Sequence, residues 1–123
     1  MVPMNSVTTR AIDHARDSAE GIFSERVVRN GPLQQTVVAL REGARLAEHD
    51  SDVPASLYIM AGAVRVEASE PFVLQSGDLH EMPSRRRGVT AVMDTVMLMS
   101  AVTSIPSEDS SGSDLHDHVL PPA

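Results

Sequence analysis

The chain has 123 residues, a length that fits one domain, since domains typically run on the order of 100–150 residues. Its formal net charge of -7 argues against a general nucleic-acid binder, because such proteins neutralise backbone phosphates with clustered basic residues. It contains no cysteine, which excludes disulfides, zinc–thiolate sites and cysteine nucleophiles.

Residues 1–20 are predicted to form an N-terminal arm. The first dozen residues mix Ser, Thr, Asn and Pro without a period, whereas Ala, Arg, Asp and Glu dominate residues 10–20. A short helix in residues 10–20 would have a thin apolar face of Ile12, Ala15 and Ala19, so we expect at most an accessory segment there. The start does not resemble a secretory signal, and no stretch approaches the roughly 18 apolar residues of a membrane helix. We therefore expect a cytoplasmic protein without a membrane partner.

From residue 21 to residue 103 the pattern changes to short apolar runs separated by turn residues, which is typical of an antiparallel all-β domain. The predicted strands are 23–29, 34–41, 44–48, 56–60, 63–68, 72–74, 78–82, 88–93 and 95–103. Val64 and Val66 alternate with Arg65, which predicts one solvent-facing side for that strand. Strand 95–103 is apolar on both faces and is therefore expected at the centre of a sheet.

Nine short strands in about eighty residues favour a small barrel or jelly-roll sandwich. Residues 104–123, rich in Ser, Asp and Pro, have no apolar period and are predicted to be a disordered acidic tail.

Two glycine-anchored segments carry a family resemblance. The first has Gly43, the run Leu46-Ala47-Glu48-His49 and the hairpin glycine Gly62, and the second has Gly77, Asp78 and Pro83. Over residues 35–102 the chain resembles a small, single-domain cupin of the RmlC-like superfamily, within a subgroup of short bacterial proteins. The resemblance implies a jelly-roll barrel, the cupin double-stranded β-helix.

The resemblance also implies where a metal would be bound, because three histidines and a glutamate hold a divalent metal inside the barrel of that family. His49 occupies the first histidine position, whereas Ser51, Ala55 and Arg87 stand at the other three. One imidazole falls short of the roughly three protein ligands of a catalytic metal. We therefore expect no metal cofactor at this site.

Arg87 is the main candidate for ligand binding. It ends the triplet Arg85-Arg86-Arg87, and a guanidinium that faces the barrel would bind an anion, because its donors match carboxylate and phosphate oxygens. The alternative is a solvated loop in which the arginines pair with acidic residues. His49 is expected beside Arg87 at the mouth of the barrel.

Four further residues complete the candidate ligand site. Tyr58 and Met60 share one face of a strand, as do His80 and Met82 on another. Methionine adapts to varied ligands, although ordinary core filling is the alternative. His49, His80 and Glu81 are the alternative metal site.

Three functional hypotheses follow. The first is a cupin-fold protein that binds a small, anionic ligand without a metal, with Tyr58 and the methionines lining the interior. The second is a metal-dependent enzyme of the dioxygenase or isomerase type with a rearranged site, and the third is a dimeric interaction module. A homodimer is expected from the resemblance and from the exposed edges of short strands.

Overall fold

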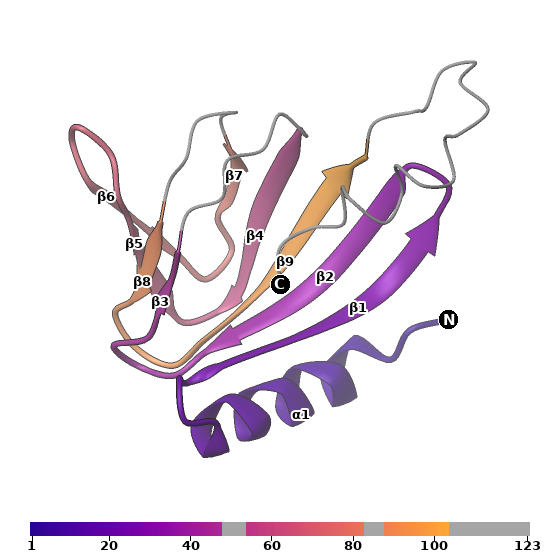
Figure 1. Ribbon diagram of the computed structural model, residues 1–123, viewed down its shortest axis with the longest axis horizontal. Helices are drawn as coiled ribbons and strands as arrows, with labels where there is room; N and C mark the ends of the chain where they lie inside the picture. Colours follow the sequence, from indigo (N-terminus) through magenta and orange to yellow (C-terminus); the bar gives the residue numbers. More distant parts are fainter. Residues whose placement is uncertain (48–53, 83–87, 104–123) are drawn as a thin grey trace.

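A computed structural model describes residues 1–47, 54–82 and 88–103 of the chain. In this part the chain has one helix and nine strands (Figure 1). In chain order they are α1 (Met4–Asp17), β1 (Ile22–Asn30), β2 (Leu33–Leu40), β3 (Arg45–Leu46), β4 (Ala55–Ala61), β5 (Ala63–Val66), β6 (Phe72–Gln75), β7 (Leu79–Met82), β8 (Val89–Ala91) and β9 (Thr95–Val102).

The strands form two antiparallel sheets. The larger has the order β1-β2-β9-β4-β7, and the smaller has the order β3-β8-β5-β6. Each predicted strand overlaps an observed one, and β9 lies at the centre of the larger sheet, as its two apolar faces predict. The all-β, two-sheet fold class expected from the sequence is thus confirmed.

The two sheets meet at one end of the molecule and diverge toward the other (Figure 1). We call the first the closed end; it contains the turns at residues 41–44, 61–62 and 92–94. The other is the open end, where β4 begins and where β7 and β9 end. Strand pairing places Ala55, Met82 and Ala101 side by side at the open end.

An apolar core fills the space between the sheets. Residues of one parity on each strand face this core, because successive side chains of a strand point to opposite faces. Its buried members come from both sheets: Val38, Leu40, Leu57, Ile59, Val64, Val66, Leu74, Val89, Ala91, Met97 and Met99. Burying one such aliphatic side chain contributes roughly 1.5–3 kcal/mol, so this inner core is the main source of stability.

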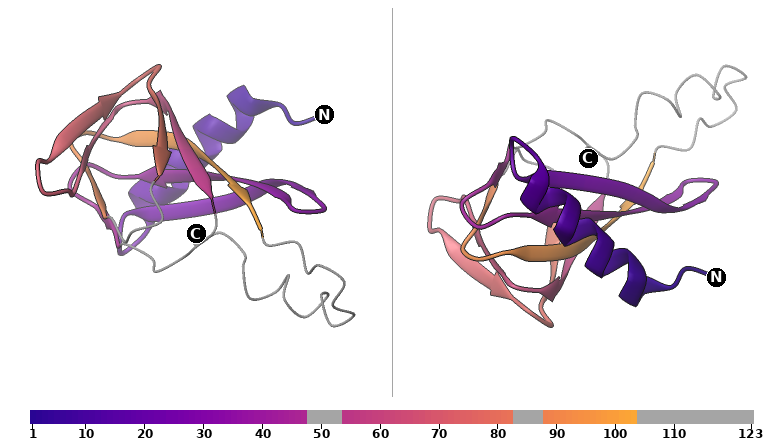
Figure 2. Two further views of the ribbon diagram at one scale, coloured as in Figure 1. Left: turned by 90° about the horizontal axis from the view of Figure 1, so that it is seen from above. Right: turned by 90° about the horizontal axis from the view of Figure 1, so that it is seen from below.

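Helix α1 covers the outer face of the larger sheet, below β1 and β2 (Figures 1 and 2). Val7, Ala11 and Ala15, four residues apart along one side of the helix, pack against Val37 and Ala39 of β2 and form a second core. The helix begins at Met4 and ends at Asp17, so the short helix considered for residues 10–20 is present in part, and the aperiodic arm expected before residue 10 is wrong for residues 4–9. Small side chains on a helix add little to a hydrophobic pattern, yet they allow close contact with a sheet.

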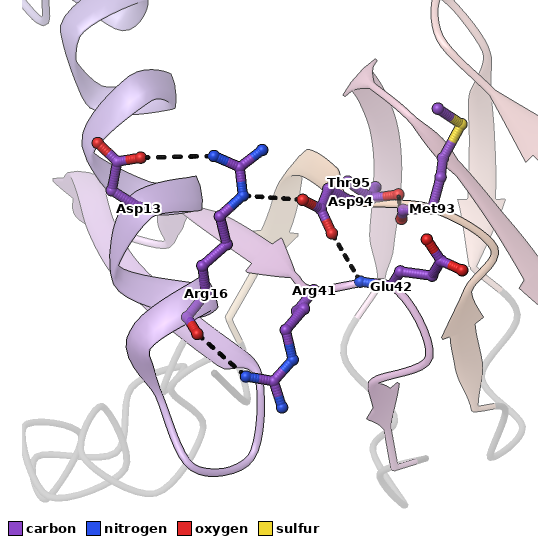
Figure 3. Close-up of polar contacts among 7 residues, drawn as sticks. All are labelled: Asp13, Arg16, Arg41, Glu42, Met93, Asp94 and Thr95. Carbon is purple, nitrogen blue, oxygen red and sulfur yellow. Dashed lines mark hydrogen bonds and ion pairs between the residues drawn. The ribbon is translucent and has the colours of Figure 1, made fainter.

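Polar contacts hold the closed end together (Figure 3). Asp94, in the turn between β8 and β9, accepts a hydrogen bond from Arg16 Nε at 2.9 Å and one from the backbone N–H of Glu42 at 2.8 Å. Arg41 Nη1 donates to the carbonyl oxygens of Arg16 and Ser18 at 3.1 and 2.9 Å. These bonds link the end of α1, the end of β2 and the β8–β9 turn.

Candidate functional site

The two residues expected at the barrel mouth, His49 and Arg87, lie outside the described residues, as do Ser51 and Pro83. Of the family's four metal-ligand positions, only that of Ala55 is described. Ala55 has no side-chain donor atom. The residue types at the four positions therefore do not fit the family's metal.

Tyr58 and Met60 are not inside the barrel. Both lie on β4, where Leu57 and Ile59 point into the inner core. Tyr58 points outward and is 40% exposed, and Met60 packs against the helix-side core. The expectation that these two residues line the interior is wrong, because the inward positions of β4 have the other parity.

His80 and Met82 lie on the inner side of β7. The His80 ring contacts the Phe72 ring of β6, with 5.0 Å between centroids, and Met82 packs against the inner core. Glu81, between them, is exposed on the opposite face of the strand. His80 and Glu81 therefore do not converge on one metal position.

Across residues 1–47, 54–82 and 88–103, no group of three or more His, Asp or Glu side chains is placed to hold a metal ion. The described part of the chain also has no helix with the length and apolar character needed to cross a membrane.

Strand β1 contains a β-bulge at Val27. On one side of it Arg26 pairs with Thr36 of β2, and on the other Arg29 pairs with Gln34. Two residues three positions apart on a regular strand point to opposite faces. The extra residue of a bulge shifts this alternation by one position, so that both side chains point to the same face. The bulge therefore puts both arginines on the same face of the sheet.

That face is the inner one. Gln34 and Thr36 alternate along β2 with Val38 and Leu40, which belong to the inner core. Directly opposed residues of an antiparallel pair share a face, with Cβ atoms roughly 4.5–5.5 Å apart. We call Arg26, Arg29, Gln34 and Thr36 the inner polar block; it lies toward the open end, beyond the apolar core.

The inner polar block contains two buried polar atoms without a hydrogen-bond partner. Gln34 is 1% exposed and its Oε1 is unpaired, as is Arg26 Nε. An unsatisfied buried polar group costs about 1–3 kcal/mol, and native proteins contain few of them.

Three arginines of the described chain form ion pairs with carboxylates, and the two arginines of the inner polar block do not. Arg10 pairs with Glu25 at 2.8 Å, Arg16 with Asp94 at 2.9 Å and Arg45 with Glu67 at 2.5 Å. The hydrogen bond from Arg45 lowers the pKa of the Glu67 carboxyl. Within the described residues, Arg26, Arg29, Arg41 and Arg65 form no ion pair. Of these, Arg41 donates to backbone carbonyl oxygens and Arg65 is exposed, whereas Arg26 has a buried Nε without a partner.

A hollow of about 640 Å³ lies on the outside of the molecule, along α1. Its lining consists of Asn5, Ser6, Thr9, Arg10, Asp13 and His14. Two of these side chains attach the helix to the sheet: Arg10 through Glu25, and His14 through its stack on Phe23, with ring centroids 4.7 Å apart. Two of the side chains that line the hollow are therefore engaged in attaching α1 to the sheet.

The inner polar block was not foreseen from the sequence. Gln34 and Thr36 could have been found, because they continue the two-residue period of Val38 and Leu40 and so share their inward face. Arg26 and Arg29 gave no comparable signal, since only the bulge brings them to one face.

Solved structures share this fold. A conserved protein of unknown function from Streptococcus pyogenes superposes with a TM-score of 0.61 at 24% identity, over 69% of this chain and 76% of that one. An RmlC-like cupin from Shewanella frigidimarina gives 0.62 at 17% identity, over 68% and 78% of the two chains. Salicylate 1,2-dioxygenase from Pseudaminobacter salicylatoxidans gives 0.69 at 20% identity, over 79% of this chain but 33% of the dioxygenase.

No family model matches the sequence, and no curated protein matches it. The identities to solved structures are low, so these likenesses establish the fold alone. Together with the two-sheet topology, they confirm the expectation drawn from the two glycine-anchored motifs: the chain is a small domain with the RmlC-like cupin fold.

Proposed function

We propose that this domain binds a small organic anion at the open end of its barrel, without the metal site of the family. The observation that carries the proposal is the side-chain amide oxygen of Gln34, Oε1, which is buried on the inner face without a hydrogen-bond partner. A polar group kept there at a cost to stability is explained when a ligand completes its hydrogen bonds.

Two further points support an anion. Arg26 and Arg29 supply positive charge on the same inner face, and guanidinium groups bind carboxylates and phosphates in bidentate fashion. One structural neighbour is a salicylate dioxygenase, and salicylate is a small carboxylate. Arg87 and His49 stay predictions for additional contacts at the mouth.

The proposal is tested by thermal unfolding of the full chain with salicylate, malate, inorganic phosphate and glucose as probes. A ligand at one hundred times its Kd stabilises a protein by about 2.7 kcal/mol. We expect one or more of the anions to raise Tm and glucose to leave it unchanged. Equal Tm with every probe contradicts the proposal.

The metal-dependent alternative is decided on the same sample. Elemental analysis of protein purified without a histidine tag is expected to show far less than one transition metal per chain. A stoichiometric metal that survives purification would favour the enzyme hypothesis over a metal-free binding protein.

A second proposal concerns a homodimer, and it rests on the outer face of the larger sheet. Helix α1 covers this face over β1 and β2, whereas β4 and β7 carry the exposed pair Tyr58 and Leu79, the latter 68% exposed. Large apolar side chains exposed together are typical of protein contacts. A second copy of the chain would bury them symmetrically.

Light scattering after size-exclusion chromatography tests the dimer. L79E is expected to convert a dimer to a monomer, because it would bury a charge at the interface. V73E is the matched control, since Val73 is 51% exposed on β6 of the other sheet and should leave the dimer intact. A wild-type monomer at high concentration contradicts this proposal.

A further inference from the structure

We propose that the inner polar block recognises a small dicarboxylate that carries a hydroxyl group. The inference rests on the proposed function and makes it more specific: Arg26 and Arg29 each bind a carboxylate, and Gln34 binds the hydroxyl between them.

The first step is the spacing of the two arginines. They stand opposite Thr36 and Gln34, which are two residues apart on β2, so their backbones are separated by on the order of 7 Å along the strand. Arg26 is half-buried and Arg29 is exposed at the strand end. Two flexible arginine side chains that start from this backbone separation on one face can reach two carboxylates joined by a short carbon chain.

The second step is the absence of a competing anion within the described chain. Arg10, Arg16 and Arg45 are engaged by Glu25, Asp94 and Glu67. Arg26 and Arg29, like the exposed Arg65, have no carboxylate partner among the described residues, but only Arg26 and Arg29 lie on the inner face. Arg26 Nε is buried without an acceptor. A guanidinium nitrogen removed from water gains most from a charged acceptor, because charge-assisted hydrogen bonds are roughly twice as strong as neutral ones.

The third step distinguishes the ligand from a simple diacid. The buried Oε1 of Gln34 is an acceptor, and a carboxylate offers it no hydrogen. With the Gln34 amide oriented as in the structure, a ligand that carries only carboxylates would leave this oxygen unsatisfied. A hydroxyl group satisfies it by donating one hydrogen bond, while the flanking carboxylates stay on the arginines.

Malate and succinate form a matched pair of probes, because they share two carboxylates and differ by one hydroxyl. Isothermal titration calorimetry of the full chain is expected to show tighter binding of malate. R26Q and R29Q should each weaken both probes about tenfold or more, since hydrogen bonds to charged groups contribute about 1.5–3 kcal/mol. Q34M should weaken malate about fivefold to tenfold, since a neutral hydrogen bond contributes about 0.5–1.5 kcal/mol, and it should not weaken succinate.

R65Q is the control for net charge. Arg65 is an exposed arginine on β5 that points away from the inner core, so its removal changes the charge of the protein without touching the inner polar block. Both probes should bind R65Q as they bind the wild type. Thermal unfolding of each variant checks that it is folded, and R29Q tests the site even where R26Q fails to fold, because Arg29 is exposed.

The outcomes separate this inference from the proposed function. Anion binding that is unchanged in R26Q and R29Q but lost in R87Q overturns the inference and leaves the proposed function standing. Equal affinity of malate and succinate in both wild type and Q34M overturns the role of Gln34. Binding of phosphate or salicylate without binding of either diacid overturns the ligand class, and the absence of any anion binding overturns both proposals.

Discussion

The buried polar groups of the closed end and those of the inner polar block differ in whether the chain itself supplies their hydrogen-bond partners. At the closed end Asp94 accepts hydrogen bonds from Arg16 and Glu42, and the buried hydroxyl of Thr95 exchanges bonds with the backbone of Ala63. In the inner polar block, toward the open end, Gln34 is nearly as buried as Thr95, yet its side-chain amide oxygen has no hydrogen-bond partner.

The difference indicates a division of roles along the barrel axis. Polar groups at the closed end are satisfied within the chain, so they contribute to folding. Two atoms of the inner polar block, Arg26 Nε and Gln34 Oε1, are left unsatisfied by the chain, as in sites whose partner is a ligand. Substitutions at the closed end should therefore change stability, and substitutions in the inner polar block should change binding.

The largest expected effect comes from Gly62→Ala at the closed end. Gly62 has φ +97°, and a Cβ there would meet the carbonyl oxygen of Asp94 and, at 2.5 Å, Thr95 Oγ1. Left-handed backbone costs a non-glycine residue about 1–2 kcal/mol, and overpacking adds about 1–3 kcal/mol. Urea denaturation should therefore show a loss of roughly 2–5 kcal/mol in the free energy of unfolding.

Gly77→Ala is the matched control, because Gly77 has nearly the same φ, +94°, with nothing within 4 Å of the added carbon. It should lose only the backbone part, about 1–2 kcal/mol. Equal losses in the two variants would show that contact with the β8–β9 turn does not matter at the closed end.

Asp94→Ala should have the next largest effect. It removes acceptors for Arg16 Nε and for the Glu42 N–H, and bonds to a charged group contribute about 1.5–3 kcal/mol, reduced here by partial exposure. We expect a loss of about 1–2 kcal/mol at pH 7 in chemical denaturation, with anion affinity unchanged. Asp94→Asn keeps one acceptor oxygen and should lose less.

The difference in the free energy of unfolding between the wild type and Asp94→Ala should depend on pH, because folding changes the pKa of Asp94. The backbone N–H of Glu42, and then the Arg16 guanidinium, lower the pKa of the carboxyl in the folded state. Its stabilisation is therefore complete above the unfolded pKa near 3.9 and is lost as pH falls through the lower folded value. The wild type and Asp94→Ala should converge in stability below about pH 4, and a gap that stays constant into acid would assign the effect to packing.

The fold could be predicted from the sequence because its signals are local. Turn glycines such as Gly43, Gly62 and Gly77 adopt positive φ, and the alternation of Val64 and Val66 with Arg65 shows one buried face. The length of α1 was missed, because its contact side is made of Val7 and two alanines whose burial depends on the sheet below them.

The site was predicted less well than the fold. Tyr58 and Met60 were assigned to the interior because they share one face of a strand, but a shared face alone does not say which face of β4 is inside. Arg26 and Arg29 share a face only through the bulge at Val27, and a bulge depends on strand pairing that no single strand encodes. His49 and Arg87 lie outside the described residues, so their roles stay predictions.

Gln34→Met has the smallest expected effect on stability and is the most informative substitution, because it should stabilise the fold whereas the others should destabilise it. Gln34→Met replaces a buried, unpaired amide with an apolar side chain of similar volume. Removing an unsatisfied buried group recovers part of its cost of about 1–3 kcal/mol, and we expect the free energy of unfolding to rise by roughly 0.5–1 kcal/mol. Thr95→Val is the matched substitution at the closed end, where the lost hydroxyl had partners, so it should destabilise. A loss of stability in both variants would mean that Gln34 supports the fold, and the contrast between the two ends would then fail.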